Sequence, residues 1–297
     1  MSRLFLVDGH SLAFRAFYAL PADMATPAGL FTNAVYGFTS MLVKLLADER
    51  PDYLVVAFDT PARTFRDEMD GGYKATRSET PQVFADQLPL IRSVLDVLAI
   101  PVVEVDGVEA DDVLATLATT AAAQGVDAVV VTGDRDAFQL VEDPHVRVLY
   151  NRRGVSDYVL YDEAGIVDRT GVTPRQYPEY AAMRGDASDN LPGVPGIGEK
   201  TAASLLQRFG SIEGIYQHLD ELPPKQRENL GVCRDRVLLN HEMTVLRRDV
   251  EGVVTLSLDD LRQGAWDVGE VRKLFAQLSF RTLLDRLLET VGGGEAP

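Results

Sequence analysis

Acidic residues follow several of the apolar segments that form the first half of this sequence. Short β-rich runs alternate there with amphipathic helical patterns, which is typical of an α/β protein with a mostly parallel sheet. The carboxyl ends of parallel strands meet at one rim of a sheet, where ligands bind. The expected strands are Leu4–Val7, Tyr53–Phe58, Val102–Val105, Ala128–Thr132 and Val146–Tyr150, and the expected helices are Asn33–Ala47, Pro81–Leu98 and Ala110–Gln124.

Five separate segments supply carboxylates to this expected rim. Three strands are followed by single aspartates or an aspartate pair, and the DGVEADD segment carries three acidic residues into a helix N-terminus. The RGDASDN segment adds two aspartates at i and i+3, a spacing that shares one face of a helix. The nine candidate metal ligands are Asp8, Asp59, Glu109, Asp111, Asp112, Asp134, Asp136, Asp186 and Asp189.

So many like charges at one rim repel each other unless cations offset them. Mg²⁺ and Mn²⁺ prefer oxygen ligands and leave coordination positions for water and phosphate. Two such ions can hydrolyse a phosphodiester. A single aspartate at a strand end is more often a helix cap or turn residue. The coincidence of five segments is more specific and favours a metal centre.

Composition limits the other classes of function. The formal net charge is −16, which by itself argues against phosphate binding, but basic residues gather at 63–77 and 198–208. The single cysteine excludes an internal disulfide framework and fits a cytoplasmic protein. No apolar run approaches the roughly 18 residues of a membrane span, and the beginning of the chain lacks a signal-peptide core. We therefore expect no membrane partner.

The segment Thr60–Thr80 is long and polar for a loop of an α/β domain, and such loops are commonly functional. It follows Asp59 directly and would overhang the metal rim. Cations interleaved with aromatic rings suit single-stranded nucleic acid. The alternative is an exposed charged loop without a ligand. Its candidate DNA-binding residues are Arg66, Tyr73, Lys74 and Arg77.

The second half of the chain favours helices. They are expected at Pro174–Met183, Glu199–Phe209, Ile212–Leu219, Lys225–Leu246 and Val268–Leu288. The segment NLPGVPGIGEKTAAS predicts a glycine turn that opens into a helix, and exposed amides at such a point bind backbone phosphates. It matches neither a dinucleotide nor a phosphate-loop motif. The candidate DNA-binding residues are Gly196, Gly198, Lys200 and Thr201; the alternative is an ordinary helix–helix turn.

Together these segments resemble one known family. FLVDGHSLAFRAFYAL, AFDTPARTFR, YKATR, VEADDVLATLA, VVTGDRDAFQLV and RGDASDNLPGVPGIGEKTAASLL are similar to motifs of the bacterial 5′ nucleases, from about residue 3 to about residue 288. That family comprises the N-terminal nuclease domain of DNA polymerase I and free-standing flap endonucleases. Two departures lie beside the YKATR motif. Thr76 replaces the more frequent asparagine, and Gly71 with Gly72 replaces a proline and a charged residue, which affects arch geometry and threading.

The resemblance implies a PIN-like or resolvase-like sheet at 1–173 with a helical arch at about 60–80. It implies a helical DNA-binding domain at 174–290, with a helix–three-turn–helix at about 185–220, and we expect a flexible tail at 291–297. It also implies two or three Mg²⁺ or Mn²⁺ ions and, in many members, a K⁺ ion at the Pro192–Lys200 turn. Lys74 and Arg77 match arch residues that contact the scissile phosphate, and with Asp134 and Asp136 they are the expected catalytic residues. Arg15 and Tyr18 match positions near the entrance for the 5′ strand.

The predicted function is two-metal hydrolysis of DNA near a single-strand/duplex junction, by a monomer that acts on 5′ flaps in replication and repair such as Okazaki fragment processing. Three alternatives stay open. The first is a structure-specific DNA-binding module without turnover, and the second is an RNA-processing nuclease, with RNA–DNA hybrids as a further substrate. The third is a nucleotide-binding α/β regulator. The sequence also leaves open the balance of exonuclease and flap endonuclease activity, and whether the chain is free-standing or a polymerase domain.

Overall fold

A six-stranded sheet forms the centre of the computed structural model, which describes residues 2–292. The strand order is β3-β2-β1-β4-β5-β6, with the first five strands parallel and β6 antiparallel to β5, which confirms the mostly parallel sheet. β1, β2 and β4 are buried on both faces, as strands of a covered parallel sheet are. The strands are β1 (Arg3–Asp8), β2 (Tyr53–Ala57), β3 (Val102–Val103), β4 (Asp127–Thr132), β5 (Val146–Arg153) and β6 (Asp157–Tyr161).

The sequence analysis missed β6. This edge strand has five residues and is only partly buried, so it lacks the continuous apolar run that marked the central strands. It follows β5 through a turn in which Gly154 has a positive φ of 60°. Pairing with β5 therefore creates this strand, because its own pattern is weak.

The connections place the ends of three neighbouring strands beside one another. From the central β1 the chain moves outward to β2 and β3, then crosses back to pair β4 with the other side of β1. Strand order reverses at this point, and ligands of open α/β sheets bind at such a switch point. The carboxyl ends of β2, β1 and β4 therefore form one continuous rim.

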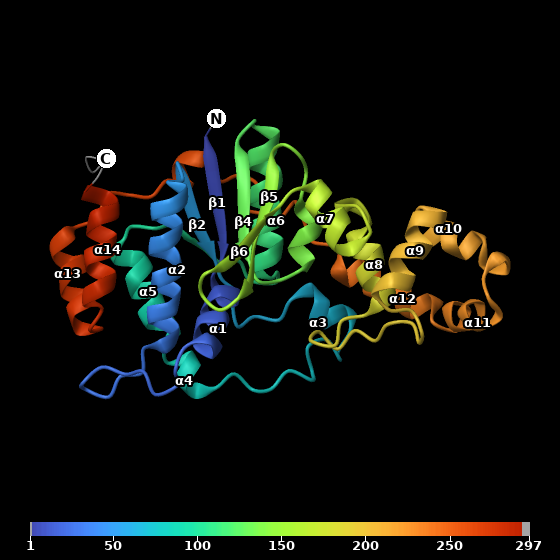
Figure 1. Cartoon of the computed structure of the whole chain (residues 1–297), viewed down its shortest axis with the longest axis horizontal. Helices are drawn as coiled ribbons and strands as arrows, with labels where there is room; N and C mark the ends of the chain where they lie inside the picture. Colours follow the sequence, from blue (N-terminus) through green and yellow to red (C-terminus); the bar gives the residue numbers. More distant parts are fainter. Residues whose placement is uncertain (1, 293–297) are drawn as a thin grey trace.

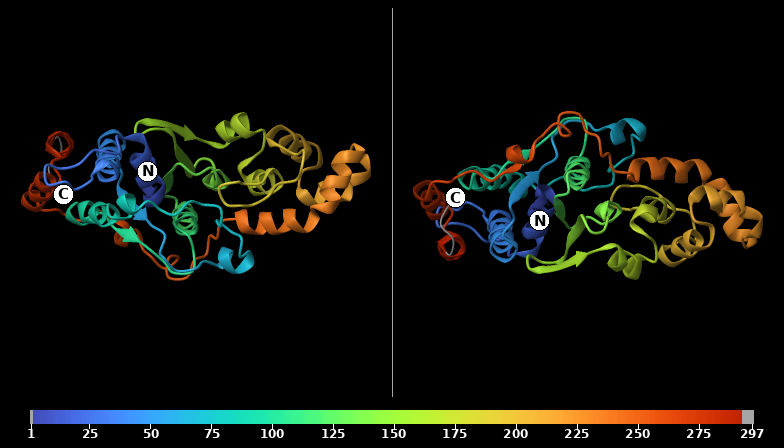
Figure 2. Two further views of the ribbon diagram at one scale, coloured as in Figure 1. Left: turned by 90° about the horizontal axis from the view of Figure 1, so that it is seen from below. Right: turned by 90° about the horizontal axis from the view of Figure 1, so that it is seen from above.

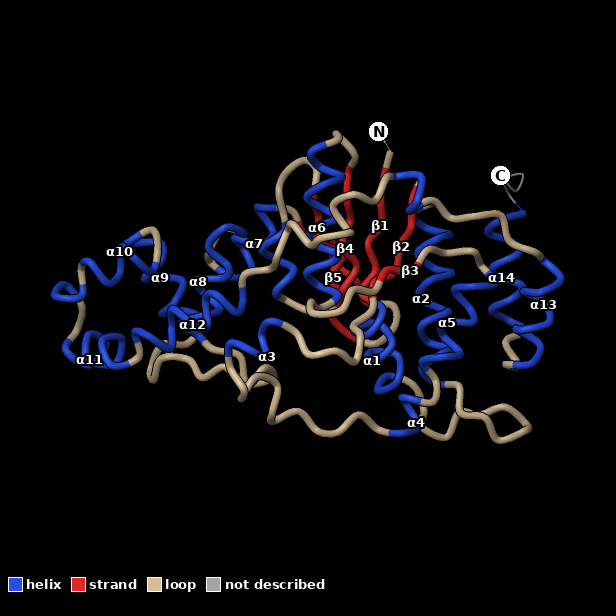
Figure 3. The backbone as a smooth tube through the Cα atoms, turned by 180° about the vertical axis from the view of Figure 1, so that it is seen from behind, coloured by secondary structure: helices blue, strands red, loops and turns tan. Residues whose placement is uncertain are grey.

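Helices cover both faces of the sheet (Figures 1 and 3). On one face lies α6 (Ala110–Ala123), against β1 and β4; on the other lie α1 (Gly9–Ala19), α2 (Asn33–Glu49) and α5 (Leu88–Val97). Outside α2 and α5 pack α13 (Val268–Gln277) and α14 (Arg281–Gly292). The last two helices thus share the hydrophobic core of the first half of the chain, while the expected division at 173 and 174 stays a prediction.

α7 (Glu163–Thr170) contacts the edge strand β6, and the helices that follow it up to α12 extend the molecule away from the sheet, at the end opposite α13 and α14 (Figure 2). α8 (Tyr177–Arg184) packs against α12 (Arg234–Thr244) and α9 (Glu199–Phe209), and α10 (Ile212–Gln217) packs against α9. The expected helix Glu199–Phe209 is confirmed with the same bounds. In the chain, α11 (Pro224–Val232) lies between α10 and α12.

Three expected helices are each divided in two. Pro81–Leu98 becomes α4 (Gln82–Ala85) and α5, because Pro89 in the first turn of α5 cannot continue a preceding helix. Lys225–Leu246 divides between α11 and α12 at Cys233, and Val268–Leu288 divides at Ser279, whose φ is 64°. The helices α1 and α7 were not expected.

The segment 60–80 differs from the expected helical arch. It contains one five-residue helix, α3 (Phe65–Met69), and continues through turns and extended backbone to α4 along one edge of the molecule (Figure 3). Gly71 and Gly72 follow α3 and disfavour its extension, because glycine loses the most backbone entropy in a helix.

At the C-terminus, α14 runs through Gly292, and the rest of the expected tail at 291–297 lies outside the described residues. In the part that the structure describes, no helix combines the length and apolar character needed to cross a bilayer.

Candidate functional site

Asp8 stands at the end of β1 and is held on both carboxylate oxygens. Its Oδ1 accepts from the Ser11 backbone N–H at 2.9 Å and so caps α1, and its Oδ2 accepts from the Thr132 hydroxyl at 2.8 Å. Burial, and the nearby charges of Asp59 and Asp134, raise the pKa of Asp8 to about 7. The β1 carboxylate thus lies in an environment that penalises its negative charge.

Asp59 and Glu109 meet at the N-terminus of α6. Asp59 Oδ1 accepts from the backbone N–H of Ala110 at 2.7 Å, so Asp59 caps a helix that lies far from it in sequence. His10 Nδ1 lies 3.2 Å from the Asp59 backbone N and 3.5 Å from its Oδ2. Glu109 is the residue before α6, and Asp111 lies in the first turn. Burial, with the charges of Asp8 and Asp134, raises the pKa of Asp111 well above its usual value.

Asp134 and Asp136 follow β4 and complete the rim. Asp134 Oδ1 accepts from the Asp136 backbone N–H at 2.9 Å. The pKa of each is raised, first by desolvation of its carboxylate and then by neighbouring carboxylates. Among residues 2–292, no ion pair to Lys, Arg or His neutralises the carboxylates of Asp8, Asp111, Asp134 and Asp136. We call these four residues the carboxylate cluster.

Asp186 and Asp189 approach the cluster from a turn and not from the helix that their spacing suggested. Asp186 Oδ1 accepts from the Ser188 N–H at 2.8 Å and from its hydroxyl at 2.6 Å, which fixes the turn. Their charges contribute to the raised pKa of Asp134 and Asp136. The turn requires Gly185, because its φ is 77° and an added Cβ would lie 2.3 Å from the Gly193 nitrogen. The spacing prediction therefore identified neighbours but assigned them the wrong local structure.

The basic residues that follow α3 dock on these carboxylates. Lys74 pairs with Glu109, and Arg77 Nη2 lies 2.6 Å from Asp189 Oδ1. Lys74 has a φ of 54°, a left-handed conformation that costs about 1–2 kcal/mol for a residue with a Cβ. Its backbone N–H donates to the Asp189 carbonyl oxygen at 3.0 Å, which helps to hold that conformation. Positive charge is thus held at the edge of the site.

Tyr73 does not face solvent, which corrects its interpretation as a DNA-binding residue. Its side chain is buried beside Leu191 and Met243, and its hydroxyl oxygen lies 3.1 Å from both Glu109 Oε2 and Asp189 Oδ2. The ring is therefore closed to base stacking in this conformation.

Asp112 and Arg66 form a closed interior pair, which corrects two further predictions. Arg66 is 2% exposed and Asp112 0%, with Nη1–Oδ2 and Nη2–Oδ1 distances of 2.7 and 3.0 Å. The backbone N–H groups of Arg247 and Glu109 also donate to Asp112, at 2.9 and 3.1 Å. Asp112 is therefore not directed at the cluster as a metal ligand, and Arg66 offers no surface to DNA. Arg66 also donates to the Met243 carbonyl oxygen at 2.7 Å, so the pair joins α3, α6 and the end of α12.

The donor set of the cluster fits hard divalent cations in chemistry. The ligand atoms that its side chains offer are all oxygens, and they lack a Lys, Arg or His partner among residues 2–292. Their pKa values are raised first by desolvation and then by neighbouring carboxylates, and a bound cation would offset both. As the side chains stand, no three acidic, His or Cys residues within residues 2–292 are grouped closely enough to hold an ion. Mg²⁺ keeps several water ligands and binds through as few as one or two carboxylates, so a group of three is not a condition for its binding.

Comparison with known proteins decides the family. Residues 3–171 match the N-terminal resolvase-like domain of the 5′-3′ exonucleases, and residues 172–268 match their C-terminal SAM fold. This chain belongs to the 5′-3′ exonuclease family. The resemblance stated from the sequence is confirmed, as are the expected fold class and the nuclease class of enzyme.

Curated relatives of this exonuclease are bacterial DNA polymerases. DNA polymerase I of Mycobacterium tuberculosis (strain H37Rv) is 48% identical over 295 residues, which cover 99% of this chain and 32% of the relative. That of Geobacillus stearothermophilus is 42% identical over 297 residues, covering 100% of this chain and 33% of the relative. The chain thus spans about a third of the length of these proteins.

Solved structures share its fold. Bacteriophage T5 5′-exonuclease with bound zinc has a TM-score of 0.66 and 22% identity, covering 97% of each chain. The T5 flap endonuclease in a complex with DNA and metal ions has a TM-score of 0.64 and 20% identity, covering 97% of this chain and 98% of that one. The catalytic core of Rad2 with a DNA substrate has a TM-score of 0.63 and 15% identity, covering 98% and 93%.

Two residues expected at the strand entrance of the exonuclease lie on α1. Arg15 donates to the carbonyl oxygens of Asn151 and Arg152 at 3.1 and 3.4 Å, and its guanidinium packs against Gly133, next to Asp134. Tyr18 is 70% exposed and its ring stacks on Phe14 with 6.3 Å between centroids. An exposed aromatic ring therefore lies on the same helix as the Arg15 cation.

The glycine turn leads into α9 as expected. Gly196 has a φ of 79°, Gly198 is the residue before the helix, and Lys200 lies exposed in the first turn with Thr201 beside it. The Asn229 side chain donates to the Pro195 carbonyl oxygen at 2.7 Å and ties the turn to α11. The backbone N–H groups at the start of α9 lack helical partners, as in any helix.

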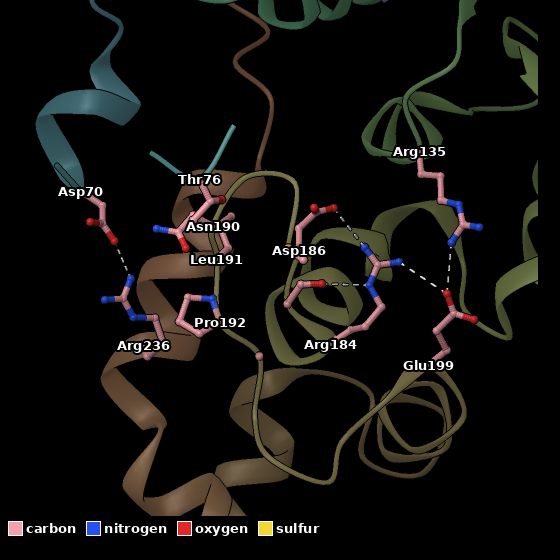
Figure 4. Close-up of a pocket in the computed structure, with 13 residues that line it drawn as sticks. Asp70, Thr76, Arg135, Arg184, Asp186, Asn190, Leu191, Pro192, Glu199 and Arg236 are labelled. Carbon is pink, nitrogen blue, oxygen red and sulfur yellow. Dashed lines mark hydrogen bonds and ion pairs between the residues drawn. The ribbon is translucent and has the colours of Figure 1, made fainter. Parts of the chain in front are cut away.

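The sequence analysis did not single out the arginines beside the cluster. Arg135, Arg184 and Arg236 line a pocket of about 960 Å³ together with Asp186 and Glu199 (Figure 4). A signal was present, because Arg135 separates two cluster aspartates and Arg184 precedes Gly185 in the RGD segment. Arg135 and Arg184 were missed because the aspartates of the same motifs gave the stronger signal, that of a metal site.

Proposed function

We propose that this exonuclease is a structure-specific 5′ nuclease that cleaves 5′ flaps and DNA ends beside a single-strand/duplex junction. The observation that carries the proposal is the group of unneutralised carboxylates at the switch point of the sheet. Family membership supports a nuclease reaction. The proteins of similar fold that were crystallised with DNA support DNA as the substrate. Such an activity serves replication and repair, including Okazaki fragment processing, in the bacterial cytoplasm.

We propose two or three Mg²⁺ or Mn²⁺ ions as cofactors. Bound in pairs, such ions activate water and stabilise the leaving oxygen of a phosphodiester. Asp8 and Asp59 already cap helices, so these two are proposed to act on the ions through water. A K⁺ ion at the Pro192–Lys200 turn is a further proposal. The residues proposed to hold the divalent ions directly are Glu109, Asp111, Asp134, Asp136, Asp186 and Asp189.

Lys74 and Arg77 are proposed to contact the scissile phosphate. Their ion pairs with Glu109 and Asp189 hold two positive charges beside the cluster. When a phosphodiester lies at the cluster, Lys74 Nζ and the Arg77 guanidinium would donate to its oxygens. Donors fixed where charge develops lower a barrier because they need little reorganisation.

The substrate path follows from three further surfaces. The Gly196–Gly198 turn with Lys200 and Thr201 would hold the duplex backbone, and Arg15 with Tyr18 would receive the 5′ strand. A division near residue 173 is proposed between the α/β nuclease and the helical DNA-binding part, and the change of family model between 171 and 172 supports it. α13 and α14 then belong with the α/β part, on which they pack. We propose that the protein acts as a monomer.

A labelled 5′-flap oligonucleotide tests the proposal. We expect cleavage near the junction with Mg²⁺ or Mn²⁺, leaving a 5′-phosphate and a 3′-hydroxyl, and none with EDTA. A blunt duplex of the same sequence is the control, and a ribose-containing 5′ arm tests RNA–DNA hybrids. Binding without EDTA-sensitive cleavage would overturn the catalytic proposal in favour of a DNA-binding module.

A further inference from the structure

One glutamate carboxylate oxygen is shared by two arginines at the wall of the pocket in Figure 4. Glu199 Oε1 lies 3.1 Å from Arg135 Nη1 and 3.8 Å from Arg184 Nη1. The three residues come from different elements: Arg135 follows β4, Arg184 ends α8, and Glu199 begins α9. The tertiary fold therefore brings two guanidinium groups to one carboxylate oxygen of Glu199.

Contacts with the Gly185 carbonyl oxygen and the Tyr180 ring fix the orientation of the Arg184 guanidinium. Its Nε donates to the Gly185 carbonyl oxygen at 3.1 Å, and the guanidinium carbon lies 5.4 Å from the centre of the Tyr180 ring. The side chain is 14% exposed, and Nη2 lies 3.5 Å from Asp186 Oδ2. The Nη1 group is directed towards Glu199 and is the part of Arg184 that an anion in the pocket would contact.

Glu199 is held much less firmly. Its side chain is 60% exposed, and ion pairs in contact with water contribute little because solvent screens them. Carboxylates and phosphodiesters both offer paired anionic oxygens, and arginine binds both in the same forked geometry. A phosphate could therefore replace the glutamate carboxylate between the two arginines at small cost.

The position of the pocket indicates which phosphate that is. Asp186, beside the carboxylate cluster, lines the pocket together with Gly193 and Glu199 of the turn into α9. A DNA strand whose backbone lies on that turn and whose cleaved bond lies at the cluster would run beside this pocket, because residues of the turn line it and Asp186 adjoins the cluster. A phosphodiester between these two points would face Arg135 and Arg184.

We propose that Arg135 and Arg184 form a second phosphate-binding site, which takes one internal backbone phosphodiester of the substrate, and that Glu199 occupies this site until DNA displaces it. The proposal rests on the proposed nuclease function. Glu199 thereby competes with non-specific anions for the two arginines. A phosphate bound there would fix the spacing along the DNA strand between the Gly196–Gly198 turn and the cleaved bond.

The first test measures binding of a fluorescent 5′-flap DNA to the full chain in EDTA across a salt series. We expect Arg135→Ala to weaken binding severalfold and to reduce the slope of log K against log salt by about one, as the loss of one phosphate contact does. Arg135→Lys should restore most of that slope, because it keeps the charge. Glu199→Gln should tighten binding, because it removes the competing anion.

The matched control is the Arg3–Glu49 pair, with 3.1 Å between Nη1 and Oε2, at the opposite end of β1. Arg3→Ala and Glu49→Gln should leave the slope unchanged. An Arg135→Ala slope equal to that of wild type, or weaker binding by Glu199→Gln, would overturn the proposal.

The second test identifies the phosphate. Single uncharged methylphosphonates are placed at successive positions of the flap substrate. At one position the loss of affinity seen with wild type should vanish with Arg135→Ala, because both changes remove the same contact. Additive losses at every position would overturn the site. A wild-type chain that neither binds nor cleaves flap DNA would instead reject the proposed function itself, whereas cleavage with additive losses rejects only this inference.

Discussion

Asp111 and Asp112 are neighbours in sequence, in the same first turn of α6, yet they lie in opposite electrostatic environments. The Asp111 carboxylate faces Asp8 and Asp134, lacks an ion pair within residues 2–292, and has a raised pKa. The Asp112 carboxylate accepts hydrogen bonds from Arg66 and from two backbone N–H groups in a buried network. One region holds unrelieved repulsion, and the other is fully compensated.

The difference follows from helix geometry. Consecutive residues of an α-helix project about 100° apart, so one turn presents Asp111 to the rim and Asp112 to the interior. The Arg66–Asp112 pair fixes the N-terminus of α6, so the neighbouring carboxylates are not needed for that role and are available to bind cations. The carboxylate cluster, which requires cations, therefore lies next to an ion pair that is already neutral.

The largest expected effect is the loss of catalysis when the carboxylate cluster is changed. Asp134→Asn should abolish cleavage of flap DNA, because the cluster loses a charged oxygen donor, while DNA binding in EDTA persists. Asp157→Asn, which removes an exposed partner of Arg152, is the control. Cleavage at the wild-type rate by the Asp134 variant would refute the assignment of the cluster.

Paired substitutions on α6 break the comparison directly. In EDTA, Asp112→Asn should lower the free energy of unfolding by about 3 kcal/mol, because it removes the carboxylate closest to the buried Arg66 guanidinium and leaves Glu109, 3.5 Å from Arg66 Nη1, as its ion-pair partner. Asp111→Asn should raise it, by on the order of 1 kcal/mol, because it removes a negative charge that burial and the neighbouring carboxylates both disfavour. Urea denaturation measures both. Shifts of the same sign would show that the two environments do not differ as described.

Lys74 tests whether the cation docked at the edge of the site acts in chemistry. Lys74→Ala should slow single-turnover cleavage by about 10²-fold, as loss of a charge-stabilising donor does. Lys44→Ala, which removes an exposed cation of α2, should have no effect. A change confined to DNA affinity would argue against a role for Lys74 in the chemical step.

A small effect is expected when Mg²⁺ binds to the folded chain. Adding Mg²⁺ at about ten times its Kd should stabilise the wild type by about 1.4 kcal/mol, provided that the ion binds only the folded chain. The gain should fall in Asp111→Asn, which lacks a cluster charge. Thermal unfolding measures the shift, and equal gains in both proteins would mean that Mg²⁺ binds elsewhere.

Local sequence patterns predicted the parts of the fold that depend on local physics. The central strands form at their expected positions, because their continuous apolar runs suit burial on both faces. α9 begins at Glu199, after the glycine turn, as the turn chemistry indicated. β6 escaped prediction because its pairing with β5, and not its own pattern, makes it a strand.

The sequence by itself determined which acidic segments end strands of a mostly parallel sheet, and therefore which residues could share one rim, because strands that alternate with helices run parallel and their carboxyl ends lie on the same side of the sheet. Only the tertiary structure decided which carboxylates stay uncompensated. Asp112 and Arg66 are 46 positions apart in the chain. The partners are 35 positions apart in the Lys74–Glu109 pair and 112 apart in the Arg77–Asp189 pair. The packing of elements that are distant in sequence brings such side chains together, and the spacing of residues along the chain does not specify that packing.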